Sequence, residues 1–241
     1  MLAAKARLIL ALDVPNQGEA RRLVSLLQDE VGLFKVGLEL FMAAGPRFLE
    51  TLAAELPGRI FLDLKFHDIP ATVQGALGHL PQGVAMTTVH TDQGPSGLKA
   101  VSQGSAGDVK LLAVTILTSL SSDDLLSLGY DPQYAQDPAR LVLLRARLAH
   151  EAGCHGVICS GREARTVKDA LGEDFLVVCP GIRPAWAVVP GDDQKRPVTP
   201  YEAIKNRADY LVVGRPIRQA PDPVAAARQT AAEIEEGLKE R

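Results

Sequence analysis

The chain has 241 residues, of which 46% are hydrophobic and 23% are charged, and its formal net charge is −3 at pH 7. This near-neutral balance argues against a dedicated nucleic-acid-binding protein, which needs a surplus of basic residues. No apolar run approaches the ~18 residues of a membrane-spanning helix, and the apolar stretch 8–12 is too short for a signal peptide because Asp13 ends it. We therefore expect an ordinary globular protein of the cytoplasm, without nucleic-acid or membrane partners.

Eight short aliphatic or β-branched runs recur along the chain. They cover residues 8–14, 34–40, 60–66, 84–90, 110–117, 156–160, 175–182 and 210–217. Most of them are nearly continuously apolar, which is typical of parallel strands that are buried on both faces. The first five begin about 25 residues apart, which is the length of one strand-and-helix unit.

Amphipathic segments lie between these runs and predict helices, for example over residues 19–30, 137–151 and 222–238. Regular alternation of strands and helices indicates an α/β fold with a parallel sheet. Eight units in this length match a (β/α)8 TIM barrel, and no linker divides the chain, so we expect a single TIM-barrel domain over residues 1–241. A doubly wound sheet is the alternative, but no glycine-rich nucleotide-binding motif follows any strand.

Two connections, 118–136 and 181–198, are too long to be plain turns. Each follows the carboxyl end of a predicted strand, which is the catalytic face of a barrel, and long loops in compact domains are usually functional.

The cysteines Cys154, Cys159 and Cys179 are odd in number and lack CxxC spacing, so we expect free, buried thiols, with a metal or redox role as the alternative.

The third run carries the densest chemical signal, because it ends in Asp63-Leu64-Lys65-Phe66 and is followed directly by His67 and Asp68. Asp63 and Lys65 are two residues apart and therefore share a strand face. Charges that face a barrel interior cost several kcal/mol each unless they are paired. We predict that the carboxylates of Asp63 and Asp68 hold Lys65 as an ammonium group that donates a proton. A surface Asp–Lys pair is disfavoured because the flanking residues are apolar.

Two further strand ends add charges to the same face. Asp13 closes the first run, and Lys35 lies in the otherwise apolar second run. A buried lysine rarely lacks a partner, so we expect a carboxylate near Lys35. Because Lys35 comes early in its strand, its side chain must reach upward to join the site.

The last two strands predict an anion site. Gly214 and Arg215 end the eighth run, where glycine allows close backbone approach and arginine offers a forked donor that suits phosphate. Arg183 and Gln194 lie in the long loop after the seventh run, and barrels often bind phosphate after these two strands. A solvated loop with incidental charge is the alternative.

The five histidines lack metal-ligand spacing, so we predict no metal site, and only His90 could approach the predicted site.

Seven motifs, in order along nearly the whole chain, resemble the orotidine 5′-phosphate decarboxylase family. They are LALD (10–13), KVGLELF (35–41), DLKFHDIP (63–70), LTSL (117–120), PGIRP (180–184), GDDQKR (191–196) and VVGRPI (212–217). The resemblance implies a homodimeric TIM barrel that converts orotidine 5′-phosphate to UMP and CO₂, the last step of UMP synthesis. It also implies that no metal or organic cofactor takes part.

By resemblance, Lys65 is the donor of a proton to C6, and Asp63, Asp68 and Lys35 complete its charged network. Asp68 and Thr72 resemble residues that reach across the dimer interface into the partner's site. The remaining contacts implied are Asp13 and Lys35 to the ribose, Thr118 to the pyrimidine, and Arg183, Gln194, Gly214 and Arg215 to the phosphate and lid. One departure is Ala71, where the family usually has Asn.

Physical chemistry agrees with these implied roles. Loss of CO₂ from C6 leaves a carbanion that no carbonyl or cofactor delocalises. Such a barrier needs stabilisation near the top of the ~8–23 kcal/mol range, and a fixed ammonium at Lys65 suits that charge. Binding of the remote phosphate would drive closure over the reacting carbon.

Two alternatives remain. One is a Mg²⁺-dependent sibling of the 3-keto-gulonate-phosphate decarboxylase or hexulose-phosphate synthase type, which has an acidic ligand where this chain has Lys35, and an ammonium there would repel the metal. The other is a non-catalytic phosphate-ligand binder, against which the intact Asp63, Lys65 and Asp68 argue.

Overall fold

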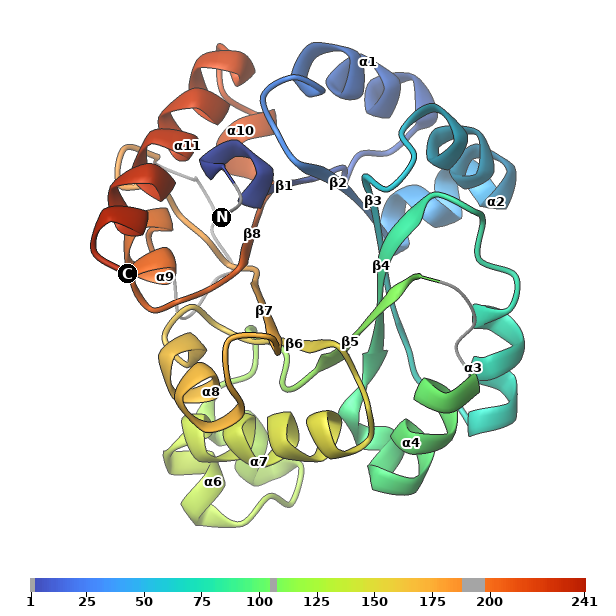
Figure 1. Ribbon diagram of the computed structural model, residues 1–241, viewed down its shortest axis with the longest axis vertical. Helices are drawn as coiled ribbons and strands as arrows, with labels where there is room; N and C mark the ends of the chain where they lie inside the picture. The colour runs from blue at the N-terminus through green and yellow to red at the C-terminus, as the bar shows by residue number, and fades with distance from the viewer. Residues whose placement is uncertain (1–2, 105–107, 188–197) are drawn as a thin grey trace.

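The computed structural model describes residues 3–104, 108–187 and 198–241. Within these ranges eight parallel strands follow one another around a closed barrel, and β8 pairs with β1. The strands are β1 Leu8–Ala11, β2 Leu33–Gly37, β3 Ile60–Phe66, β4 Val84–His90, β5 Lys110–Val114, β6 Gly156–Ile158, β7 Leu176–Cys179 and β8 Tyr210–Val213. Figure 1 shows them as an inner ring surrounded by helices, so the predicted TIM barrel is confirmed.

Helices follow the strands around the outside of the barrel. They are α1 Gln17–Leu27, α2 Leu38–Glu55, α3 Pro70–Leu77, α4 Gly94–Gly104, α5 Ser122–Ser127, α6 Pro132–Gln136, α7 Pro138–Glu151, α8 Ala164–Leu171, α9 Pro200–Lys205, α10 Arg215–Arg218 and α11 Pro223–Lys239, with 3-10 turns η1 Ala4–Arg7 and η2 Thr91–Gln93. The three helices expected from amphipathic spacing correspond to α1, α7 and α11.

Helix caps account for where α1 and α11 begin. The Asn16 side chain accepts the backbone N–H of Glu19, so α1 begins at Gln17, two residues before the predicted start. Asp222 accepts the N–H groups of Val224 and Ala225 and starts α11. Asp-Pro pairs therefore open both α7 and α11, but only at Asp222 does the side chain cap the helix.

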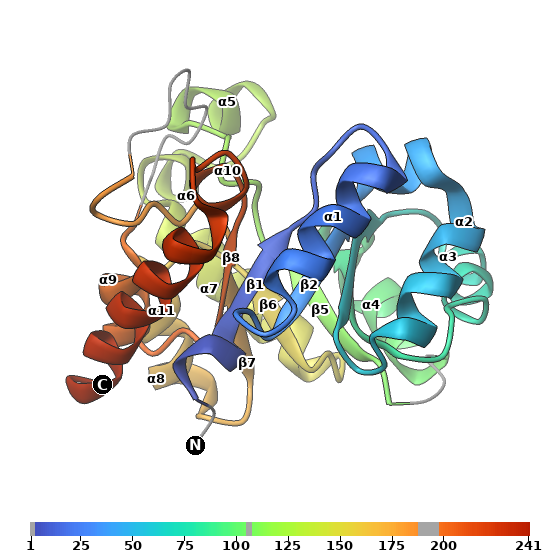
Figure 2. The ribbon, with the colours of Figure 1, turned by 90° about the horizontal axis from the view of Figure 1, so that it is seen from above.

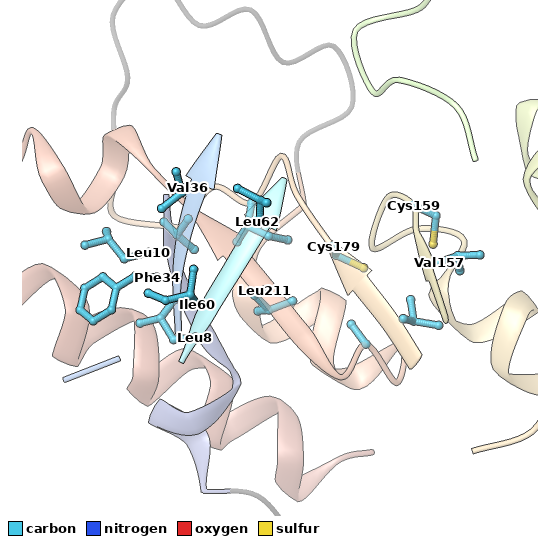
Figure 3. Close-up of a cluster of buried hydrophobic side chains, with 14 of the residues drawn as sticks. Leu8, Leu10, Phe34, Val36, Ile60, Leu62, Val157, Cys159, Cys179 and Leu211 are labelled. Carbon is cyan, nitrogen blue, oxygen red and sulfur yellow. The ribbon is translucent and has the colours of Figure 1, made fainter. Parts of the chain in front are cut away.

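Alternation along the strands separates two apolar layers. Side chains such as those of Leu8, Leu10, Phe34 and Val36 pack outward against the helices, as Figure 3 shows. A second cluster fills the barrel interior and consists of Ile9, Ala11, Leu33, Phe61, Met86, Leu112, Val114, Ile158, Val178 and Val212. The barrel is therefore a packed core, with helices sealing its outer face.

On the strand face that points into the barrel, polar side chains follow the apolar ones two residues further along the chain. Two residues beyond Leu33, Phe61 and Met86 come Lys35, Asp63 and Thr88, and two residues beyond Ala11 comes Asp13. Because side chains alternate along a strand, these polar groups lie directly above the interior apolar cluster, at the carboxyl ends of the strands. Six of the eight strands end earlier than predicted, for example β1 at Ala11 and β5 at Val114, whereas β3 and β4 match their predicted bounds.

The structure describes the first long connection in full and the second in part. The segment 118–136 contains α5 and α6, and Figure 2 shows α5 and α10 at the end of the barrel away from the N-terminus. In the second long connection, residues 188–197 are outside the described ranges, but Ile182 and Val198 form a parallel bridge that joins its two ends.

The three cysteines are buried and none of them forms a disulfide, as predicted. Burial raises the pKa of the Cys154 thiol to about 12, so that this group stays protonated at neutral pH. None of the helices in the described part of the chain is long and apolar enough to cross a membrane.

Candidate active site

Two adjoining cavities open at the carboxyl ends of the strands. The first, of about 540 Å³, is walled mainly by apolar side chains and is lined by Lys35, Phe61, Asp63, Lys65, Val114, Ile116, Leu117, Thr118, Ile158, Pro180 and Val212. The second, of about 750 Å³, is lined by Ala11, Asp13, Lys35, Asp63, Pro180, Gly181, Arg183, Val212, Gly214, Arg215 and Arg218. Because they share Lys35, Asp63, Pro180 and Val212, they form one cleft with an apolar half and a cationic half.

The predicted ion pair on β3 is present in the apolar half. Lys65 Nζ donates to both carboxylate oxygens of Asp63, at 2.9 Å each. The Asp63 side chain is 13% exposed and that of Lys65 is 34% exposed, so the ammonium faces the cavity while the carboxylate lies beneath it. This arrangement can present a proton donor beside a fixed negative charge.

The backbone at Lys65 is not that of a regular strand. Lys65 has φ of 52°, in the left-handed region, which costs an L-residue roughly 1–2 kcal/mol. The register of β3 against β4 shifts at the same place, because Leu62 pairs with Thr87 but Phe66 pairs with Val89. Asp63 and Lys65 therefore meet in a bulge, and not on one face of a regular extended strand as predicted from their spacing.

Lys35 lies in the middle of β2, later in its strand than predicted, and its side chain reaches the site. Its Nζ lies 2.8 Å from Asp13 Oδ1 and 3.8 Å from Asp63 Oδ2. A Cβ on Gly37 would come within 2.8 Å of this Nζ and 2.9 Å of the Asp13 oxygen, so glycine keeps the path of the lysine open. The charges thus alternate along Asp13, Lys35, Asp63 and Lys65, and Gly37 is a contributor that sequence reasoning missed.

Asp68 and Thr72 are exposed on the segment after β3. Asp68 Oδ1 accepts the N–H of Ile69 at 2.6 Å, and the described contacts within this chain include none from Asp68 to Lys65. The adjacent Ile69 is 67% exposed, and Met42 on α2 is 77% exposed. Among the described residues of this chain, therefore, Asp63 alone supplies a carboxylate that pairs with Lys65.

The cationic half brings together residues from the ends of β7 and β8. Arg183 follows β7, Gly214 and Arg215 follow β8, and all three line this cavity. Arg218 joins them, and its Nε is buried with no hydrogen-bond partner in the described ranges. Its position one helical turn after Arg215 is the signal that sequence reasoning overlooked. Gln194 lies outside the described residues.

Thr118, for which the resemblance implies a contact with the pyrimidine, lines the apolar half next to Leu117. His90 lines neither half of the cleft. Its ring stacks on His67, with centroids 5.3 Å apart, and its Nδ1 lies 2.9 Å from Asp92 Oδ2. His90 is thus part of a neighbouring network rather than of the cleft.

Arg145 of α7 ties that network to the segment that carries α5 and α6. Its guanidinium donates to Asp92, to the Thr115 carbonyl and to the Tyr130 hydroxyl. Burial lowers the pKa of His90, an effect that Asp92 opposes and Arg145 reinforces. In the part of the chain that is described, no group of three or more His, Cys, Asp or Glu side chains could hold a metal ion.

Comparison with known proteins gives a consistent result. Residues 6–230 match the model of the orotidine 5′-phosphate decarboxylase / HUMPS family. Orotidine 5′-phosphate decarboxylase of Desulfosudis oleivorans is 48% identical over 98% of this chain and 96% of its own, and that of Moorella thermoacetica is 46% identical over 96% and 93%. The crystal structure of orotidine 5′-phosphate decarboxylase from Lactobacillus acidophilus matches with a TM-score of 0.77 at 38% identity, over 94% of this chain and 98% of that one.

Proposed function

The chain belongs to the orotidine 5′-phosphate decarboxylase family, and on that premise we propose how its cleft divides the work of the reaction. The reaction is the conversion of orotidine 5′-phosphate to UMP and CO₂, the last step of UMP synthesis. We also place the protein in the cytoplasm, as for other enzymes of this family.

One observation carries the assignment of residues: the cleft has an apolar half that contains the Lys65–Asp63 pair and a cationic half that contains arginines. A nucleotide has the same division, because its base is flat and weakly polar while its phosphate is anionic. We place the pyrimidine against Thr118 in the apolar half, the ribose at Asp13 and Lys35, and the phosphate against the residues of the cationic half. Those residues are Arg183, Gly214, Arg215 and Arg218, with Gln194 from the long loop.

The chemical step then needs only groups of the protein. When the bond from C6 to the carboxylate breaks, its electron pair stays on C6, and Lys65 Nζ transfers a proton to that carbon as CO₂ leaves. Asp63 holds the ammonium in place at 2.9 Å, and its charge faces the departing carboxylate. Apolar walls such as Phe61 and Val114 keep water out, which strengthens these electrostatic interactions. Solvent restores the proton of Lys65 after UMP leaves.

We further propose that the enzyme is a homodimer in which Asp68 and Thr72 serve the site of the partner. Exposure of both side chains supports this, since neither lines the cleft of its own chain. The exposed Ile69 between them offers apolar surface to a second copy. A second carboxylate delivered beside Lys65 would complete the acid–base–acid arrangement that one chain provides only in part.

A decarboxylation assay tests the proposal directly. Orotidine 5′-phosphate is incubated with the protein, and loss of substrate absorbance and formation of UMP are followed with and without EDTA. We expect UMP to form in proportion to substrate lost, at a rate that EDTA does not change. A rate abolished by EDTA would favour the Mg²⁺-dependent sibling, and saturable binding without turnover would favour a phosphate-ligand binder.

A further inference from the structure

We propose that Thr88 is a positioning residue that holds Lys65 and Asp63 in their reactive arrangement through one hydroxyl group. Thr88 is completely buried in β4. Its Oγ1 accepts the backbone N–H of Lys65 at 2.9 Å and donates to Asp63 Oδ1 at 3.0 Å. A hydroxyl group has one proton to donate and lone pairs to accept, so it makes both bonds at once.

The register between β3 and β4 explains why a side chain is needed at this point. Leu62 pairs with Thr87 and Phe66 pairs with Val89, so three residues of β3 lie opposite the single residue Thr88. The N–H of Lys65 consequently points to a side-chain oxygen instead of a strand carbonyl. Thr88 thereby supports the left-handed backbone of Lys65, which L-residues rarely adopt.

The hydrogen bonds close a ring. The Lys65 N–H reaches Thr88, the Thr88 hydroxyl reaches Asp63, and the Asp63 carboxylate accepts from the ammonium of the same lysine. The ammonium is therefore fixed relative to its own main chain. Without the hydroxyl group, the Asp63 carboxylate loses a donor that sets its orientation, and the bulge loses its link to β4.

Thr88 does not line either half of the cleft, so it acts on the reaction through Lys65 and Asp63 and not through the substrate. The inference accordingly rests on the proposed role of Lys65 as proton donor. A loss of alignment of the reacting groups lowers kcat, since misplacement by about 1 Å costs on the order of 10² in rate. Substrate binding depends mainly on the remote cationic half and should change little.

Thr87 provides a matched control. It is also completely buried in β4, and its hydroxyl donates to the Leu62 carbonyl at 3.0 Å, but as the next residue it points to the other face of the strand. Thr87→Val and Thr88→Val therefore each remove one buried hydroxyl and keep the side-chain shape. Only the second removes a bond to the catalytic pair.

The test compares kcat, KM and the melting temperature of Thr88→Val, Thr88→Ser and Thr87→Val. We expect Thr88→Val to lower kcat by about 10- to 100-fold with KM changed by less than about threefold. Thr88→Ser keeps the hydroxyl group and should stay within about threefold of the wild-type kcat. Thr87→Val should also lower the melting temperature, because it removes a buried hydrogen bond, while keeping the wild-type kcat. If Thr88→Val does not fold, Thr88→Cys, which has the shape but only weak hydrogen bonding, should show the loss in kcat.

Three results would overturn the inference: a kcat for Thr88→Val equal to that of Thr87→Val, a loss that Thr88→Ser does not recover, or a loss confined to KM. Lys65→Ala is measured beside them to separate the two proposals. Turnover retained in Lys65→Ala overturns the proton-donor role and this inference with it. An inactive Lys65→Ala together with a fully active Thr88→Val overturns the role of Thr88 alone.

Discussion

Lys65 donates to both carboxylate oxygens of Asp63, the residue only two positions before it, at 2.9 Å each. In an extended strand, residues two apart are separated by ~6.6 Å and their side chains run parallel. The bulge at Lys65 turns this into a closed ion pair at the floor of an apolar cavity. The position of the ammonium is therefore set before substrate binds.

Replacement of Lys65 by alanine should abolish turnover without abolishing nucleotide binding. In the proposed mechanism, the ammonium acts on the carbanion formed at C6, while the cationic half of the cleft binds the phosphate. We expect kcat to fall by at least about 10²–10⁴-fold, the usual contribution of a positioned proton donor. Calorimetry should show UMP binding within a few-fold of wild type, since binding of product does not use the proton transfer. Near-wild-type turnover in Lys65→Ala would contradict the assignment.

Mixing of two inactive variants tests the shared site. If Asp68 acts in the partner's site, a dimer of one Lys65→Ala and one Asp68→Asn chain has one site with both lesions and one with neither. Equal mixing with free subunit exchange should restore about a quarter of wild-type activity, because half of the dimers are mixed and each has one intact site of two.

The mixing experiment needs a control for exchange and one for folding. Differently tagged wild-type chains, purified in sequence on the two tags, show that exchange takes place. Thermal melting shows that both variants are folded. Absence of recovery under conditions where tagged chains exchange would contradict a site shared between subunits.

Arginine replacements in the cationic half should weaken substrate binding. Arg215→Ala removes a forked donor from the half of the cleft where we propose that the phosphate binds, and should raise KM by about 10- to 100-fold, as expected for a hydrogen bond to a charged group. Arg218→Ala should raise KM by a smaller factor, about three- to tenfold, because its guanidinium is the second cation of the same turn. Arg228→Ala is the matched control, since Arg228 is 67% exposed and pairs with Glu30 away from the cleft. An unchanged KM for Arg215→Ala would contradict the proposal that the phosphate binds in this half of the cleft.

Much of the barrel could be predicted because its signals are local. Apolar runs such as β1 and β5 are continuous, since both faces of each strand are buried, and this pattern is readable without partners. The location of the site followed from one geometric rule, that the carboxyl ends of parallel strands share one end of the barrel. That rule brought Asp13, Lys35 and Asp63 together before any distance was known.

The details of the site depend on register, which sequence does not reveal. The bulge at Lys65 exists only because β3 and β4 change register there, so neither its backbone nor the role of Thr88 is visible in a list of residues. Gly37 matters only because the Lys35 side chain passes over it. From the sequence alone Arg218 is expected to be a surface residue. Only the position of α10 in the structure shows that it lines the second cavity.

Acidification should destabilise the protein through His90. Burial, the largest cause, lowers the pKa of His90 below its ordinary value of about 6.5, so the unfolded chain binds a proton that the folded chain resists. The contribution of neutral His90 to the stability of the fold is therefore fully present above pH ~6.5. This contribution is lost as the pH falls through the lowered pKa of the folded state. A protonated ring would also face Arg145, His67 and Lys65, with Asp92 as the opposing charge.

His90→Asn removes this titration and can still accept the N–H of Asp92 through its amide oxygen. Melting temperatures of wild type and variant are compared between pH 8 and pH 5. We expect the wild type to lose more stability on acidification than His90→Asn, although the variant is less stable at pH 8 because it loses the stacking on His67. His155→Asn is a useful comparison, because burial also lowers the pKa of His155 at the opposite end of the barrel. Parallel pH profiles for wild type and His90→Asn would show that His90 does not control stability in acid.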